Sequence, residues 1–95
     1  MDIIEAIDEA TRDIKAESRK RLQAISARAD EERDRAWSAY HRSRPHRRFS
    51  TQKALRVELA RIVQRKAEAD QAEVSARHRA CRKVARELRA RLASS

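Results

Sequence analysis

Histidine and cysteine side chains can bind metal ions, and one such pair in this chain has a spacing that would place both on the same face of a helix. His78 and Cys81 are three residues apart, so on a helix they would point the same way and supply half of a zinc site. No second pair with metal-ligand spacing occurs in the sequence. Cys81 also falls on an apolar stripe, where a small buried thiol is the ordinary explanation. We therefore expect no metal ion and no other cofactor.

The remaining candidates for catalysis form no recognised arrangement. His41 and His46 have no partner residues that would complete a catalytic triad. The sequence contains no Gly, which excludes the glycine-rich loops that hold phosphates in P-loop and dinucleotide-binding proteins. The sequence therefore predicts a protein that is not an enzyme.

The remaining candidate binding residues are basic. The chain has 24 Lys and Arg against 15 Asp and Glu, a formal net charge of +9. Guanidinium groups pair well with phosphates, and the ring of Phe49 could stack on a base or enter a lipid interface. The candidate polyanion-binding residues are Arg42, Arg44, Arg47, Arg48, Lys53, Arg82, Lys83 and Arg86. The alternative is that arginine simply serves as the polar residue of solvated helices, since no known nucleic-acid-binding motif accompanies the charge.

The elements that must position these residues are helices. The chain has no Gly, no Asn and a single proline, so it cannot build the turns of a sandwich or an α/β sheet. Pro45 disfavours helix at the residue before it and divides the chain into two arms of nearly equal length. We expect a helix over residues 2–43, a basic turn over 44–50 and a helix over 51–93. Matched arms predict one all-α domain over residues 1–95, a two-helix antiparallel coiled-coil hairpin.

Apolar residues recur along both arms at steps of four, four and three, an eleven-residue repeat. On the first arm the stripe is Ile3, Ile7, Thr11, Ile14, Ser18, Leu22, Ile25, Ala29, Arg33, Ala36 and Tyr40. On the second arm it is Leu55, Leu59, Val63, Lys66, Asp70, Val74, Arg77, Cys81, Ala85, Leu88 and Leu92. An ordinary amphipathic helix of period 3.6 is the alternative.

Apolar residues outside these stripes provide either a second face or a wider single face. They are Ile4, Trp37, Val57, Ile62 and Val84.

The two halves of the chain have opposite charge. Residues 1–34 carry ten acidic and seven basic side chains, whereas residues 35–95 carry five acidic and seventeen basic ones. An antiparallel hairpin would place the N-terminal acids across from the C-terminal bases. Each such exposed pair is weak, but together they favour the antiparallel order.

Polar and charged residues interrupt both stripes, so the core of an isolated hairpin would be poor. We therefore expect a protein partner or a second copy of the chain. The function predicted is that of a non-enzymatic helical assembly or adaptor protein, and nucleic-acid binding is the alternative. The expected partner-binding residues are Ile3, Ile7, Ile14, Leu22, Ile25, Trp37, Leu55, Leu59, Val74 and Leu88.

The sequence also bears on location. No run approaches the roughly 18 apolar residues of a membrane span, and the N-terminus is acidic where a secretion signal would be basic. A single cysteine cannot form an internal disulfide, which agrees with a reducing compartment. We expect a cytoplasmic protein that is not integral to a membrane.

One resemblance lies in the first arm. Residues 3–36 read IIEAIDEATRDIKAESRKRLQAISARADEERDRA. This run, with its I-x-x-A-x-x-E-A pattern, resembles the N-terminal helices of peripheral-stalk subunits (E and G types) of V/A-type rotary ATPases. The resemblance implies a long helical stalk component of a larger complex. The break at Pro45 departs from the family pattern, since a stalk helix would continue there.

Overall fold

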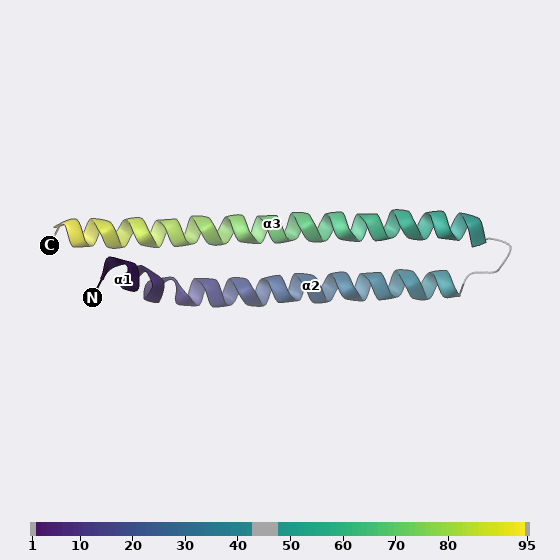
Figure 1. The fold of residues 1–95 in the computed structure, drawn as a ribbon, viewed down its shortest axis with the longest axis horizontal. Helices are drawn as coiled ribbons and strands as arrows, with labels where there is room; N and C mark the ends of the chain where they lie inside the picture. The colour runs from purple at the N-terminus through teal and green to yellow at the C-terminus, as the bar shows by residue number, and fades with distance from the viewer. Residues whose placement is uncertain (1, 43–47, 95) are drawn as a thin grey trace. The chain divides into compact units, whose positions relative to one another are not determined.

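A computed structural model describes the backbone of residues 2–42 and 48–94, and the side chains of residues 2–42 and 52–94. Three helices make up this part of the chain: α1 (Ile3–Ala10), α2 (Arg12–His41) and α3 (Arg48–Ser94) (Figure 1). The described residues include no strand, which confirms the all-α class. No helix among them is long and apolar enough to cross a membrane.

Local signals explain where the helices begin. The Asp2 side chain caps α1 by accepting a hydrogen bond from the Ile4 backbone N–H at 3.4 Å, and Glu5 lies in the first turn. The 47 residues of α3 contain neither Gly nor Pro, so nothing in the sequence interrupts the helix.

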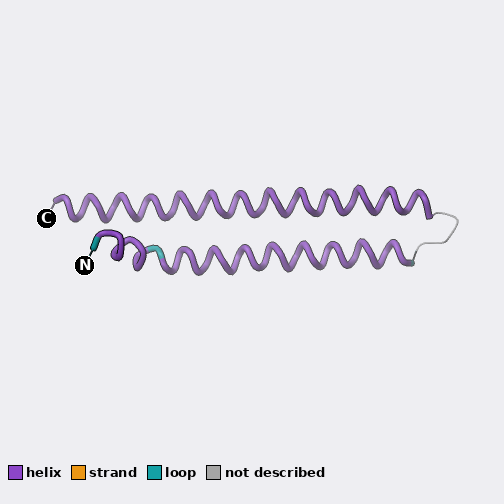
Figure 2. Tube along the Cα trace, in the orientation of Figure 1, coloured by secondary structure: helices purple, strands orange, loops and turns teal. Residues whose placement is uncertain are grey.

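The helix expected over residues 2–43 is two helices, because the chain leaves the helical conformation at Thr11 (Figure 2). Thr11 has φ −98° and ψ 0°, and its hydroxyl donates to the Ile7 carbonyl at 2.8 Å. A threonine hydroxyl that bonds the carbonyl four residues back competes with the backbone and bends helices. The Thr11 backbone N–H still reaches Ile7 O at 2.9 Å, so the ladder continues across the irregularity.

The helix ends also differ from the expected bounds. The basic turn predicted over 44–50 is helical from Arg48 onward, and its remaining residues lie outside the described part of the chain. Proline restricts its own backbone and that of the residue before it, so residues 48–50 can be helical and α3 begins before the predicted cap at Thr51. At the other end of the turn α2 stops at His41, and Arg42 donates its backbone N–H and its Nε to the Ser38 carbonyl.

The chain forms two compact units, and both α2 and α3 pass from one into the other without a helical break. Unit 1 comprises Met1–Leu22 and Gln71–Ser95, and unit 2 comprises Gln23–Asp70. Each unit therefore packs a stretch of α3 against an earlier stretch of the chain.

In unit 2, stretches of α2 and α3 that are far apart in the sequence lie side by side. Ile25 and Ala29 of α2 line one cavity with Ile62 and Ala69 of α3. Farther along α2, Ala36 and Tyr40 line another cavity with residues from an earlier part of α3. The Arg65 guanidinium donates a hydrogen bond to the Glu32 carboxylate between the two helices at 2.9 Å.

The core of unit 2 corrects two positions of the predicted stripes. Ile62 is 5% exposed and Val63 is 68% exposed, so Ile62 faces inward where the spacing predicted Val63. On α2 the side chain of Glu32 is 26% exposed and that of Arg33 is 56% exposed, so the inward position belongs to Glu32. The period of the inward positions changes in this part of α3. The inward residues follow one another at alternating steps of four and three, in place of the predicted four, four and three.

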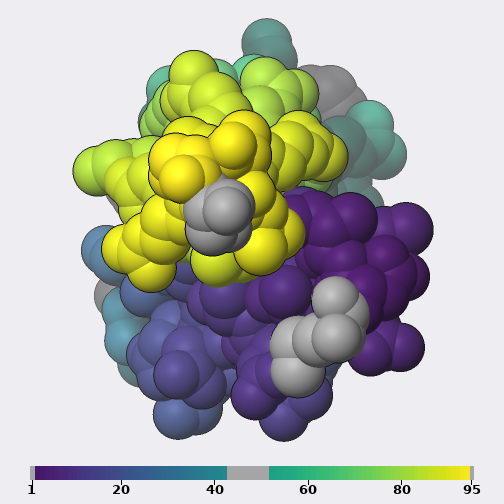
Figure 3. All heavy atoms as spheres, turned by 90° about the vertical axis from the view of Figure 1, so that its left-hand side faces the viewer, coloured from purple at the N-terminus to yellow at the C-terminus, as the bar shows by residue number. Residues whose placement is uncertain are grey.

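Unit 1 packs through small polar residues. Thr11 and Ser18 are 1% and 0% exposed, and the stripe residues around them are half-buried. Seen from the end in Figure 3, the first residues of the chain lie directly against the C-terminal turns of α3. Leu92, predicted in the stripe, is 57% exposed and marks where this packing ends.

Candidate functional site

The residues expected to bind a partner mostly line the interior of the two units. Trp37 is the exception at 42% exposure, because it stands outside the stripe. In unit 1 the half-buried members are Ile3, Ile7, Ile14, Leu22, Val74 and Leu88. In unit 2 the inward members are Ile25, Leu55 and Leu59. The stripe thus serves the chain's own packing, so a place for a partner has to be sought beside it.

An apolar groove in unit 2 offers such a place. It encloses about 580 Å³ between α2 and α3. Its apolar wall consists of Ala36, Ala39, Tyr40, Ala54, Leu55 and Val57, with Lys53, Glu58 and Arg61 as the charged residues. Three alanines in this wall leave the helix backbones accessible, which favours close approach of another helix. We call this site the apolar groove.

Aromatic rings extend the apolar groove along α2. Trp37 packs edge-to-face on Tyr40 with ring centroids 5.9 Å apart. The imidazole of His41 stacks on Trp37 at 5.8 Å with an interplanar angle of 26°. Trp37, at 42% exposure, thus continues the apolar surface beyond the groove wall, in which Val57 is itself 45% exposed.

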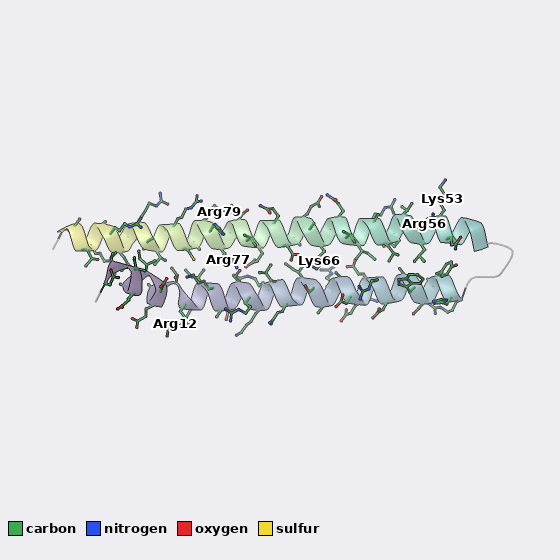
Figure 4. The ribbon with its side chains drawn as sticks, in the orientation of Figure 1. Arg12, Lys53, Arg56, Lys66, Arg77 and Arg79 are labelled. Carbon is green, nitrogen blue, oxygen red and sulfur yellow. The ribbon has the colours of Figure 1, made fainter. Side chains whose placement is uncertain are left out.

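The charge at the apolar groove is positive. Its one carboxylate, on Glu58, already lies 3.9 Å from Arg61 and 3.5 Å from Arg65. Lys53 makes no ion pair among the described residues, and its side chain extends away from α2 (Figure 4). The surplus cations would complement acidic side chains of a docked partner.

A second groove, in unit 1, brings cations from α2 and α3 together. It encloses about 680 Å³ and is lined by Lys15, Arg19, Leu22, Arg77, His78, Cys81 and Arg82. Among the described residues, no acidic one lines it. His78 and Cys81 thus share this cationic groove, and the described residues contain no group of three or more His, Cys, Asp or Glu that could hold a metal ion.

The other predicted polyanion-binding residues are spread along the chain. Arg42 is exposed at the end of α2, whereas Lys83 and Arg86 are exposed on α3. Arg48 belongs to α3 by its backbone, and its side chain lies outside the described residues, as do Arg44 and Arg47. The structure therefore brings Arg82, but not the predicted set as a whole, into one groove.

The predicted pairing of N-terminal acids with C-terminal bases does not occur among the described residues. Asp8 pairs with Lys15 at 3.8 Å, and no ion pair joins the acids of α1 to the last turns of α3. One cause is that Arg79, Lys83 and Arg86 are exposed on the face of α3 opposite its inward residues. These bases are left available to other anions.

One ion pair of unit 1 does cross between α2 and α3. Arg21 Nε donates to Glu73 Oε1 at 2.8 Å, and the Glu73 side chain is 13% exposed. This hydrogen bond lowers the pKa of Glu73 below its ordinary value of 4.5, although burial opposes the effect. The nearby Ser18 hydroxyl adds to the lowering, although it makes no hydrogen bond of standard geometry.

The Arg21→Gln variant is expected to raise the pKa of Glu73, because it removes the main cause of the lowering. A carboxyl with a lowered folded-state pKa stabilises the fold above its unfolded-state pKa, and this contribution is lost as pH falls through the folded-state value. Acidification below about 4.5 should therefore weaken unit 1 less in the variant. An NMR titration of the Glu73 side-chain carboxyl measures the pKa. Lys20→Gln, which removes an equal charge from an exposed pair with Glu17, should leave it unchanged.

The chain matches no known family model, and no curated protein or solved structure matches it significantly. The function of the chain therefore has to be inferred from the two grooves. The sequence analysis placed Ala36 in the apolar stripe but missed Ala39 and Ala54, whose one signal was a large apolar neighbour, Tyr40 and Leu55 respectively. It also missed Lys15 and Arg19, because their part of the chain is net acidic.

Proposed function

We propose that this protein is a non-enzymatic adaptor, a two-helix antiparallel coiled-coil hairpin that holds an amphipathic helix of a protein partner in the apolar groove. The observation that carries the proposal is the exposed apolar surface of unit 2, where Trp37 and Val57 border an alanine-rich wall. Surfaces of this kind receive the apolar face of a helix. The antiparallel contacts inside unit 2 support the hairpin, and the stalk resemblance of residues 3–36 agrees with a part in a larger complex.

The charge of the apolar groove determines which kind of partner helix it favours. The groove is lined by Lys53 and Arg61 and by one carboxylate, Glu58, which pairs with Arg61 and Arg65, so the net charge of its lining is positive. A second copy would bring the same cations face to face, which is unfavourable. The occupant proposed is therefore a different chain, whose helix carries acidic residues beside an apolar stripe.

Site-specific photocrosslinking in the native host tests this proposal. A benzophenone amino acid at Val57 should capture the partner, and mass spectrometry should map the crosslink to an acidic amphipathic helix. The matched control is the same amino acid at Val63, which is also exposed on α3 but does not line the groove. Equal capture at both positions, or a crosslink to a second copy of the chain at Val57, would contradict the proposal.

A further inference from the structure

The cationic groove of unit 1 lies apart in the chain from the residues of the apolar groove and has a different chemistry. Lys15 and Arg19 of α2 face Arg77 and Arg82 of α3 across it, with His78 beside them. Arg19, Arg77 and Arg82 form no ion pair among the described residues, and Lys15 has only an exposed pair with Asp8. An exposed pair of this kind contributes little. Four cations thus line the groove, and its lining includes no acidic residue from the described part of the chain.

Most acidic residues of the two helices lie away from the groove. At about 100° per residue, Glu87 lies about 140° around α3 from Arg82, and Asp13 lies about 120° around α2 from Arg19. Glu73 is the nearer carboxylate: it accepts a hydrogen bond from Arg21 and also interacts electrostatically with Arg77. Glu73 therefore offsets part of the positive charge of the groove, and the charges of Arg19 and Arg82 remain.

We propose that the cationic groove binds the phosphate backbone of a nucleic-acid duplex. Guanidinium groups match phosphate oxygens in geometry and charge, and three of the four cations are arginines. Residues 1–22 and 71–95 contain no Phe, Tyr or Trp, so unit 1 has no ring on which an unpaired base would stack. A duplex needs no such stacking and presents its phosphates at regular spacing. Recognition is then independent of sequence.

This inference does not depend on the proposed adaptor function, because it uses residues of unit 1 only. Four phosphate contacts predict a plot of log affinity against log salt concentration with a slope of about −3 to −4, at about 0.9 per contact. Fluorescence anisotropy with a labelled 20-base-pair DNA of random sequence, at roughly 50 to 200 mM salt, measures this slope.

The decisive variant is the double change Arg19→Gln and Arg82→Gln, which removes one groove cation from each helix. It should lower the slope by about 2 and weaken binding on the order of 100-fold at the lowest salt concentration. Both side chains are exposed and glutamine is a good helix former, so the circular dichroism spectrum should not change.

The matched control is the double change Arg79→Gln and Lys83→Gln, which removes the same charge from the outer face of α3 in the same unit. It should keep the slope of the unchanged protein within about one unit. Equal loss in both variants would overturn the proposal, since binding would then reflect overall charge. Two other results would also overturn it: tighter binding to the single strand than to the duplex, or binding to vesicles rich in phosphatidylserine with none to DNA.

Discussion

The Ile62→Ala variant is expected to lose about 2 to 4 kcal/mol of its free energy of unfolding. Ile62 is 5% exposed, one of the two buried apolar residues among those described, and the other is Leu55 at 8%. A chain of this size with so few buried apolar side chains has little stability to spare. We therefore expect the variant to be largely unfolded at 25 °C.

Val63→Ala is the matched control, since it also shortens a β-branched side chain at the next position of the same helix. Val63 is 68% exposed, so the change should alter the free energy of unfolding by less than about 0.5 kcal/mol. Urea denaturation followed by circular dichroism, repeated over a range of protein concentrations, gives both values. If Val63→Ala proved the more damaging change, the inward register of α3 would be the one predicted from the sequence spacing.

That pair of residues also shows how far the sequence predicted the fold. The absence of Gly and Asn and the single Pro45 were enough to predict an all-helical chain with a break near its middle. An eleven-residue repeat held for the first arm as far as Ala29, where each predicted position down to Ile3 is buried or half-buried. Helix propensity and the spacing of apolar residues are local properties of the sequence, so they predict well which segments are helical.

The predictions were wrong at positions where packing between helices determines which residue faces inward. Steps of four, four and three place Arg33 and Val63 in the predicted stripe, whereas in unit 2 Glu32 is half-buried and Ile62 is buried. A helix can change from an eleven-residue to a seven-residue period without any signal in its composition. The break at Thr11 depends likewise on the hydrogen bond from its hydroxyl to the Ile7 carbonyl. The residues around Thr11 favour helix, so the sequence gives no sign of this break.

The grooves were harder to predict than the helices. Alanine is common on every face of this chain, so only the structure shows which alanines lie beside Tyr40 and Val57. The cationic groove combines residues more than fifty positions apart, and a count of charge along the sequence assigns its two halves opposite signs. Sites of this kind depend on the pairing of helices and not on either helix alone.

The Ala54→Glu variant is expected to abolish most of the binding of the acidic partner helix. Ala54 lines the apolar groove, and a longer carboxylate there would fill the groove and repel acidic side chains of the occupant. Central positions of protein interfaces contribute about 2 to 4 kcal/mol when disrupted. The affinity should therefore fall by a factor of roughly 30 to 1,000.

Ala67→Glu tests whether this effect comes from the groove or from added negative charge. Ala67 is exposed on the same helix and lines none of the cavities described above, so its replacement should change the affinity by less than about threefold. Alanine and glutamate are both good helix formers, and both variants should keep the helix content of the unchanged protein. Titration calorimetry with the partner helix identified by crosslinking gives the affinities. Equal weakening by the two changes would place the partner away from the apolar groove and leave only a general electrostatic attraction.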